Sequence, residues 1–136
     1  MKKTTGNETL EDRIAAACRG LTYMSETDAP VEPFNGGRAD ELSPDAIRKA
    51  TGSDAKAHLE ETDTAEFFSR LTAIKDWYTA GQKRDAHRFA ALEKLMRENL
   101  TDLHVYRFGR IRVAIYVVGL DPDKNILGLK TTAVET

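Results

Sequence analysis

An alternation of apolar residues with mostly polar ones between positions 110 and 117 constrains the fold of this chain most. The apolar positions are Ile111, Val113, Ile115 and Val117, and those between them are Arg110, Arg112, Ala114 and Tyr116. Successive side chains of a β-strand point to opposite faces, so the pattern predicts a strand with one buried face and one exposed face. Such a strand needs neighbouring strands to pair with.

The flanking segments supply these neighbours. Residues 105–109 are typical of a strand and its end, and residues 126–135 are rich in β-forming side chains. The segment Asp121-Pro-Asp-Lys-Asn125 between the second and third strands has the composition of a turn. We therefore predict an antiparallel hairpin whose last residues are also the last of the chain.

The preceding residues follow the helical period instead. Residues 10–21 place apolar side chains on one helix face, with Gly20 as a C-terminal stop. Two capping pairs are possible for this helix, Thr5 with Glu8 or Thr9 with Asp12. Further helices are predicted at residues 44–51, with Ser43 as the N-cap, from Asp63 toward residues 76–78, and at residues 85–99. Residues 21–37 show neither period and are predicted as a loop, with one short strand near residues 31–34.

Length and composition fit one folded domain that spans residues 1–136. Hydrophobic residues make up 40% of the chain and charged residues 31%, a balance typical of a globular protein. The helices come first and the strands last, which favours an α+β fold with an antiparallel sheet.

The distribution of charge argues against direct contact with nucleic acid. The net charge is −2 and the isoelectric point is near 5.9, whereas phosphate contacts need a basic surface. Between positions 25 and 45, six acids and one base give a local net charge of −5; they are Glu26, Asp28, Glu32, Asp40, Glu41, Asp45 and Arg38. This acidic stretch is either a solvated loop or an electrostatic match for a basic partner.

The only cysteine, Cys18, excludes an internal disulfide and is compatible with a reducing compartment. The residues after Met1-Lys-Lys3 are polar rather than apolar, and no segment is long and apolar enough to span a bilayer. We therefore expect a cytoplasmic protein that is neither secreted nor inserted into a membrane.

No pattern in the chain predicts catalysis, a cofactor or a bound metal. His58, His87 and His104 stand on different predicted elements, and the sequence places no second group to orient any of them as a base. Cys18 lies on the apolar stripe of the first helix, where a free cysteine behaves as a small core residue.

Asp121-x-Asp123-x-Asn125 resembles the start of a calcium-binding loop. Ile126 stands where such a loop needs glycine, and Thr132 where it needs the bidentate glutamate. The segment is therefore predicted to be a turn and not a calcium site.

Trp77 is the only tryptophan, beside Asp76 and Tyr78 at the end of a predicted helix. A lone tryptophan in a small domain is commonly a core residue, but tryptophan is also enriched at binding hot spots. Composition leaves both interpretations open.

Five segments together resemble the nuclease A inhibitor family, whose members inhibit sugar-nonspecific nucleases. They occur in the family's order: Gly20-Leu-Thr-Tyr-Met-Ser-Glu26, Phe67-Phe-Ser-Arg70 with Asp76-Trp-Tyr78, Val105-Tyr-Arg-Phe-Gly109, Ile115-Tyr-Val-Val-Gly119 and Val134-Glu-Thr136. The resemblance is weak between residues 35 and 56. The matching segments are spread along the chain from the end of the first helix to the last residue.

The resemblance implies an α-β-α sandwich like that of the pathogenesis-related PR-1 proteins, without enzymatic activity. It also implies that the protein covers the active site of a nuclease. In the family, the C-terminal threonine reaches the catalytic magnesium and the glutamate of the Met-Ser-Glu turn enters the site; here these residues are Thr136 and Glu26. Asp76 and Trp77, and Glu135 next to the C-terminus, are expected on the same surface.

The implied contacts suit the chemistry of such a target. A magnesium-dependent nuclease presents a hard cation and basic side chains arranged for a phosphodiester, so a competitor must offer oxygen atoms and negative charge. Thr136 brings a hydroxyl and an α-carboxylate, and Glu26 brings another carboxylate. We therefore expect a one-to-one inhibitor of a magnesium-dependent, sugar-nonspecific endonuclease. The alternative is a non-enzymatic protein-binding module of the same fold whose partner is not a nuclease.

Overall fold

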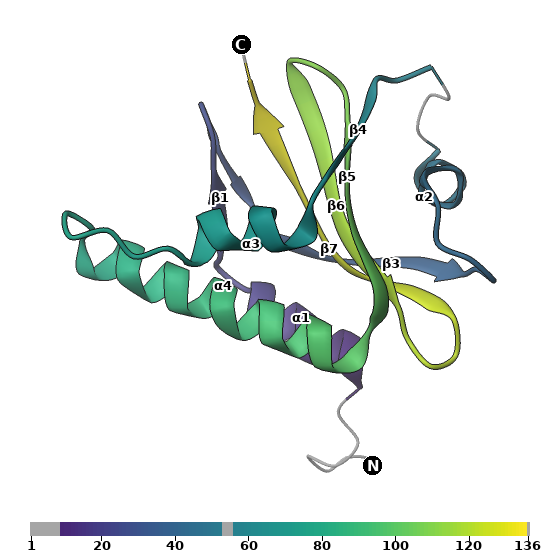
Figure 1. The fold of residues 1–136 in the computed structure, drawn as a ribbon, viewed down its shortest axis with the longest axis horizontal. Coiled ribbons are helices and arrows are strands. Elements are labelled where there is room, and N and C mark those ends of the chain that lie inside the picture. The colour runs from purple at the N-terminus through teal and green to yellow at the C-terminus, as the bar shows by residue number, and fades with distance from the viewer. Residues whose placement is uncertain (1–8, 53–55, 136) are drawn as a thin grey trace.

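The computed structural model of the protein describes residues 9–52 and 56–135. In chain order the elements are α1 (Leu10–Cys18), β1 (Thr22–Met24), β2 (Asp28–Pro30), β3 (Glu32–Arg38), α2 (Pro44–Thr51), β4 (Leu59–Thr62), α3 (Thr64–Thr72), α4 (Ala80–Asn99), β5 (Thr101–Phe108), β6 (Arg112–Leu120) and β7 (Asn125–Val134). Their arrangement is shown in Figure 1. It confirms the predicted α+β class.

The central element is a five-stranded antiparallel sheet in the order β3-β7-β6-β5-β4. Strands β5, β6 and β7 follow one another along the chain, with β6 in the middle, as the C-terminal pattern predicts. β5 begins earlier than predicted, at Thr101, and β4 was not predicted. Ile111, which the alternation placed on the buried face, lies before β6 and is 60% exposed.

Both faces of the sheet are covered, and each has its own apolar core. Ile115 and Val117 point to the face on which α1, α3 and α4 lie, where they belong to the same cluster as Leu92. Val118 belongs to a second cluster with Ile47 of α2, on the opposite face. Helices therefore lie on both sides of the sheet (Figure 1). The prediction that one face of β6 is exposed is in part wrong, because α2 covers the C-terminal half of that face.

The prediction of a loop for residues 21–37 is largely wrong, although the short strand expected near residues 31–34 is confirmed as part of the longer β3. β1 and β2 form a hairpin, and β3 pairs with β7 at the edge of the large sheet. Pro33 is tolerated because β3 is an edge strand, and a register shift between Asn35 and Gly37 forms a bulge with a positive φ at Gly37. These residues are extended because they pair with a strand far along the chain, which local composition does not reveal.

The first two helices confirm their predicted start signals. The Thr9 hydroxyl accepts from the Asp12 N–H at 3.0 Å, and the Asp12 carboxylate accepts from the Thr9 N–H at 3.3 Å. This capping box begins α1, whereas the alternative pair of Thr5 and Glu8 lies outside the described residues. Ser43 caps α2 by accepting from the Ala46 N–H at 3.1 Å.

The ends of α3 and α4 differ from the prediction. α3 ends at Thr72 instead of continuing toward Asp76. α4 begins at Ala80 and not at Asp85, because Thr79 and Gln82 form a capping box there. The early end of α3 leaves Asp76 in the turn between the two helices, outside regular structure.

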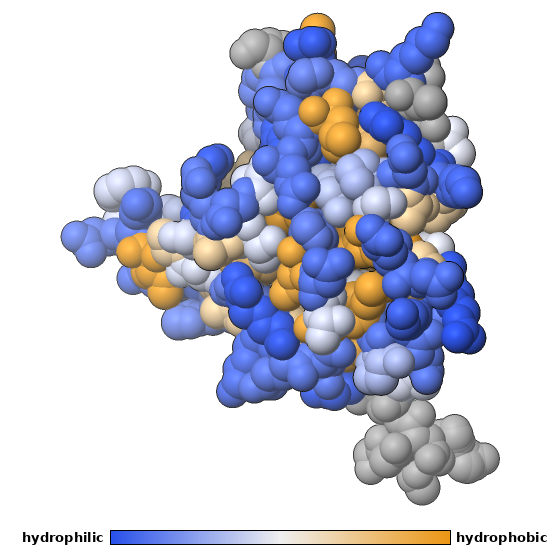
Figure 2. Space-filling model, turned by 45° about the vertical axis from the view of Figure 1, so that its right-hand side comes forward, coloured by the Kyte–Doolittle hydropathy of each residue, from blue (hydrophilic) through white to orange (hydrophobic). Residues whose placement is uncertain are grey.

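The surface is mainly hydrophilic with small apolar areas, as Figure 2 shows for one face. Among the described residues, the exposed large apolar side chains are Met24, Ile74, Trp77 and Ile111. No helix in the described part of the chain combines the length and the apolar character that crossing a bilayer requires.

Candidate functional site

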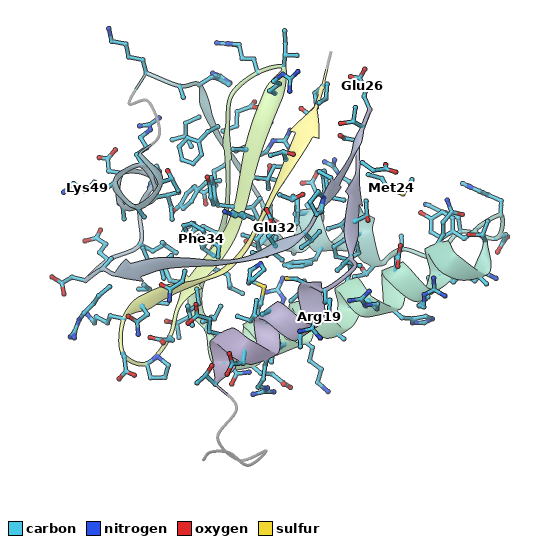
Figure 3. The ribbon with its side chains drawn as sticks, turned by 180° about the vertical axis from the view of Figure 1, so that it is seen from behind. Arg19, Met24, Glu26, Glu32, Phe34 and Lys49 are labelled. Carbon is cyan, nitrogen blue, oxygen red and sulfur yellow. The ribbon has the colours of Figure 1, made fainter. Side chains whose placement is uncertain are left out.

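The turn between β1 and β2 is hydrogen-bonded to the end of β7. The Val134 N–H donates to Ser25 Oγ at 3.1 Å, and the Glu26 N–H donates to the Val134 carbonyl at 3.3 Å. Ser25 Oγ itself donates to the Thr27 carbonyl at 2.9 Å. Figure 3 shows Glu26 at the tip of this hairpin, beside the end of β7. Two segments far apart in sequence are therefore neighbours in space.

Glu135, the last described residue, is held from two directions. Its N–H donates to the Ile111 carbonyl at 2.8 Å, and its carboxylate accepts from the Arg107 guanidinium. The Arg107 side chain is 14% exposed and that of Glu135 is 46% exposed. Burial alone would lower the pKa of Arg107, but the carboxylate of Glu135 and the hydroxyl of Tyr23 raise it overall. The guanidinium therefore stays charged and restrains Glu135.

A polar hollow of about 310 Å³ lies next to this ion pair, between the hairpin, α3 and the sheet. Its lining residues are Tyr23, Glu60, Thr62, Phe67, Arg70, Leu71, Arg107 and Glu135. The ring of Tyr23 stacks on that of Phe67, with 6.0 Å between centroids and 7° between planes. Aromatic packing on α3 therefore fixes the β1–β2 hairpin in addition to its bonds with β7.

Asp76 and Trp77 occupy the turn between α3 and α4. The Tyr78 N–H donates to the Lys75 carbonyl at 3.0 Å and closes this turn. Trp77 is 77% exposed, and its ring meets that of Tyr78 edge-on at 6.3 Å between centroids. Trp77 is therefore not a core residue, which removes one of the two interpretations that the sequence left open.

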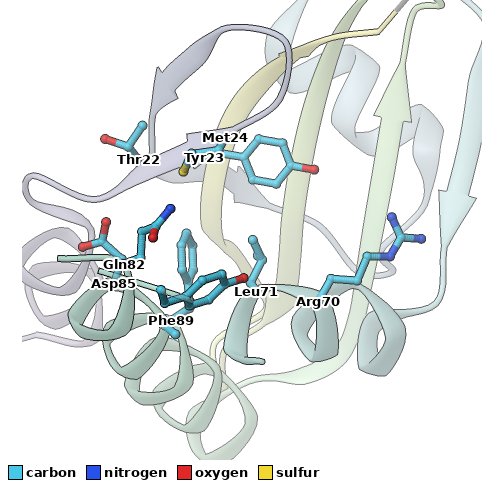
Figure 4. A pocket seen from close by; sticks show the side chains of 10 residues that line it. Thr22, Tyr23, Met24, Arg70, Leu71, Gln82, Asp85 and Phe89 are labelled. Carbon is cyan, nitrogen blue, oxygen red and sulfur yellow. The ribbon is translucent and has the colours of Figure 1, made fainter. Parts of the chain in front are cut away.

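A second hollow, of about 290 Å³, lies between β1 and the pair of helices α3 and α4. Met24 of the hairpin and Tyr78 of the α3–α4 turn both line it, together with Leu71 and Phe89 (Figure 4). The hollow therefore borders the hairpin on one side and the residue next to Trp77 on the other.

The structure brings some of the expected contact residues together and separates others. Glu26 and Glu135 are neighbours through the hydrogen bonds between the hairpin and β7. The α3–α4 turn, which carries Asp76 and Trp77, lies apart from them (Figure 1), and the second hollow is lined by Tyr78 of this turn and Met24 of the hairpin. Thr136 lies outside the described residues.

His104 has two partners that the sequence did not predict. Its Nδ1 lies 2.6 Å from Glu61 Oε2, its Nε2 lies 2.8 Å from Asp102 Oδ1, and its ring stacks on Tyr106 at 5.2 Å. Burial alone would lower the pKa of His104, but the hydrogen bonds and charges of the two carboxylates raise it overall above its ordinary value of 6.5. Both ring nitrogens are engaged as donors when protonated, which makes this imidazole a poor general base.

The other candidates for chemistry have structural roles. Cys18 is 1% exposed, and burial raises the pKa of its thiol to about 11 against the opposing charge of Arg88, as expected of a core residue. Asp121 accepts hydrogen bonds from the N–H groups of Asp123 and Asn125 at 2.9 and 2.8 Å, which is turn chemistry. Within residues 9–52 and 56–135, no three His, Cys, Asp or Glu residues are placed to hold a metal ion.

The acidic stretch is not gathered on one surface. Glu26 and Asp28 belong to the hairpin turn and β2, whereas Asp40 follows β3 and Asp45 lies in α2. The hairpin and α2 are at opposite sides of the molecule in Figures 1 and 3. Only the first part of the stretch can therefore act near the end of β7.

The sequence model of the nuclease A inhibitor-like protein family matches residues 8–136. The chain belongs to this family. The match covers nearly the whole chain, which confirms the resemblance drawn from the five segments. No curated protein matches closely enough for a comparison with an individual relative.

Sequence reasoning gave no role to Arg107 or Ser25, although both lie in segments that resemble the family. Arg107 is two positions after Val105 and shares its face, and an arginine on the core side of a strand indicates a charged partner close by. The sequence therefore contained a signal that Arg107 has a charged partner. No local signal connects Ser25 with Val134, because 109 positions separate them.

Proposed function

We propose that the protein inhibits a magnesium-dependent, sugar-nonspecific endonuclease by occupying its active site. The observation that carries this proposal is the pair of hydrogen bonds between Val134 and the turn of Ser25 and Glu26. These bonds hold Glu26 next to the segment that leads to Thr136. Glu26 and Thr136, the two residues expected to enter the active site of the nuclease, would then do so together as parts of one surface.

The chemistry of the target explains why such a surface would inhibit it. A hard magnesium ion prefers oxygen ligands, and the basic side chains around it bind a phosphodiester. With the chain ending at Thr136, its hydroxyl and α-carboxylate can approach the ion while the Glu26 carboxylate pairs with the basic groups. Glu135, which is half-buried and paired with Arg107, borders this contact. The whole surface would imitate a phosphate held at the metal.

Asp76 and Trp77 would form a second contact at the rim of the cleft. Both are exposed in a turn that is closed by a backbone hydrogen bond between flanking residues. An exposed indole on a fixed turn loses little conformational freedom on binding, which is one reason why tryptophan is common among binding hot spots.

Further expectations belong to the same proposal. They are a one-to-one complex, a cytoplasmic location, no enzymatic activity or cofactor of its own, and a layering like that of the PR-1 proteins. They stay predictions that derive from the sequence and the family resemblance.

Titration against a magnesium-dependent nonspecific nuclease tests the proposal. Deletion of Thr136 and the substitution Glu26→Gln should each weaken inhibition about tenfold or more, because each removes a contact in the centre of the interface. Glu32→Gln is the matched control, since Glu32 is an exposed acid in β3, away from the hairpin tip. Equal potency of all these proteins would contradict the mechanism. An intact protein that inhibits no such nuclease would favour a binding module with another partner.

A further inference from the structure

Arg107 and Glu135 reach the same face of the sheet from strands on either side of β6. Side chains alternate along a strand, so Arg107 shares the face of Val105, and Glu135 shares the face of Ala133. Strand β6 lies between β5 and β7. The Arg107 guanidinium therefore extends across the central strand to the Glu135 carboxylate, and ties the chain end to a strand that is not its neighbour.

The position of Arg107 is itself well defined. Only 14% of its side chain is exposed, and it lines the same hollow as Tyr23. Tyr23 is in turn stacked on Phe67 of α3. A guanidinium has a planar fork of donors, so a fixed side chain also fixes the direction in which it holds a carboxylate.

We propose that Arg107, together with Ser25, positions the C-terminal end for inhibition. Four bonds described above act on the last two described residues: Val134 N–H to Ser25 Oγ, Glu26 N–H to the Val134 carbonyl, Glu135 N–H to the Ile111 carbonyl, and the Arg107 guanidinium to the Glu135 carboxylate. Chain termini are poorly ordered unless they are tied down, and ordering them during association weakens binding. An end that is held before it meets the nuclease avoids that loss. This inference rests on the proposed function.

Arg107 also offsets repulsion at the contact surface. Glu26 and Glu135 are brought together by the hairpin, and the α-carboxylate of Thr136 would add a further negative charge. Pairing with Arg107 neutralises Glu135 and so reduces the repulsion among the acidic groups at this surface.

The order of the chain end can be measured without any nuclease. Arg107→Met keeps an unbranched apolar stem but removes the donors, so the amide order parameters of Val134 and Glu135 from nitrogen-15 relaxation should fall from about 0.85 to below about 0.6. Arg97→Met is the matched control, because Arg97 pairs with Glu93 at 2.9 Å on α4, away from the chain end. The control should leave both order parameters unchanged.

Inhibition gives the second readout. Arg107→Met should weaken inhibition about tenfold. This fold-change corresponds to the free-energy cost of ordering roughly one backbone residue on binding. The same substitution should have no further effect in a protein that already lacks Thr136, since there is then no end group to position. Arg97→Met should inhibit as the unmodified protein does.

Several outcomes would overturn the inference. Unchanged order parameters in folded Arg107→Met would do so, as would unchanged inhibition when deletion of Thr136 does weaken it. If Arg107→Met fails to fold, Glu135→Gln removes the same ion pair through a more exposed side chain and should loosen Val134 in the same way. If deletion of Thr136 has no effect, the proposed function fails, and the order parameters alone decide whether Arg107 holds the chain end.

Discussion

At the residue scale, the side chain of Trp77 is largely exposed in the turn that joins α3 to α4. Because it is 77% exposed, Trp77→Ala should change the free energy of unfolding by no more than about 0.5 kcal/mol. The same substitution should weaken binding to the nuclease by about 2 kcal/mol, the scale of a hot-spot tryptophan. Urea denaturation and calorimetric titration measure the two quantities. A dissociation constant equal to that of the unmodified protein would remove Trp77 from the contact surface.

His104 links stability to pH. Burial lowers the pKa of His104, but Glu61 and Asp102 outweigh it and raise the pKa above 6.5 in the folded state. A histidine with a raised pKa in the folded state stabilises the protein when protonated. Its contribution is therefore complete below the unfolded-state value near 6.5 and is lost as the pH rises through the higher folded-state pKa.

Replacing the ring should abolish this pH dependence. His104→Gln should lower the free energy of unfolding by about 1 kcal/mol or less at about pH 5.5, and by less at about pH 8.5, because the pair is partly solvated. His87→Gln, at an exposed position on α4, is the control. Urea denaturation at both pH values measures the difference. An equal effect of His104→Gln at the two pH values would contradict the assigned role of the carboxylates.

At this scale the sequence predicted burial in the core better than it predicted exposure or long-range partners. Cys18 was predicted to be buried because a helical stripe is a local pattern that follows from spacing alone. Exposure of Trp77 depends on where α3 ends and α4 begins, and the sequence prediction missed both ends. The partners of Arg107 and His104 depend on strand pairing and on a side chain that reaches across the sheet, which local spacing does not encode.

At the scale of elements, β6 and β7 approach each other too closely for a side chain at Gly128. A Cβ atom there would lie 1.9 Å from the Val117 carbonyl oxygen. Gly128→Ala should therefore force the two strands apart and lower the free energy of unfolding by about 3 kcal/mol or more. Gly37→Ala is the control: its φ is +80°, but a Cβ would meet nothing within 4 Å, so it should cost only about 1–2 kcal/mol. If urea denaturation shows that the two variants lose similar amounts of unfolding free energy, the close approach at Gly128 is disproved.

The elements themselves were predictable where their signal is local. The C-terminal meander follows from alternation and from the turn at residues 121–125, and the caps of α1 and α2 follow from side chains next to the helix. β1 and β2 were missed, and β3 was predicted only as a short strand near residues 31–34, because Pro33 and the nearby glycines have the composition of a loop. Pairing of β3 with β7 overrides that composition, as an edge strand permits.

At the scale of the whole molecule, the charge near the hairpin should matter more for association than the net charge. Asp28 belongs to β2 of the hairpin, whereas Asp40 follows β3, toward α2. Both are exposed acids. Asp28→Asn should slow association with the nuclease about twofold at low ionic strength and less as salt is added, and Asp40→Asn should have little effect. Stopped-flow association rates test this. Equal slowing by both variants would show that position does not matter.

The claim that the chain end enters the metal site of the target is tested most directly by blocking that end. One glycine added after Thr136 displaces the α-carboxylate, while the described bonds of Val134 and Glu135 can remain in place. The measurement is the inhibition constant of this extended protein against a magnesium-dependent nonspecific nuclease, beside that of the unmodified protein. We expect the extension to weaken inhibition about tenfold or more, as loss of a central contact does. An extended protein that inhibits as well as the original would contradict the account.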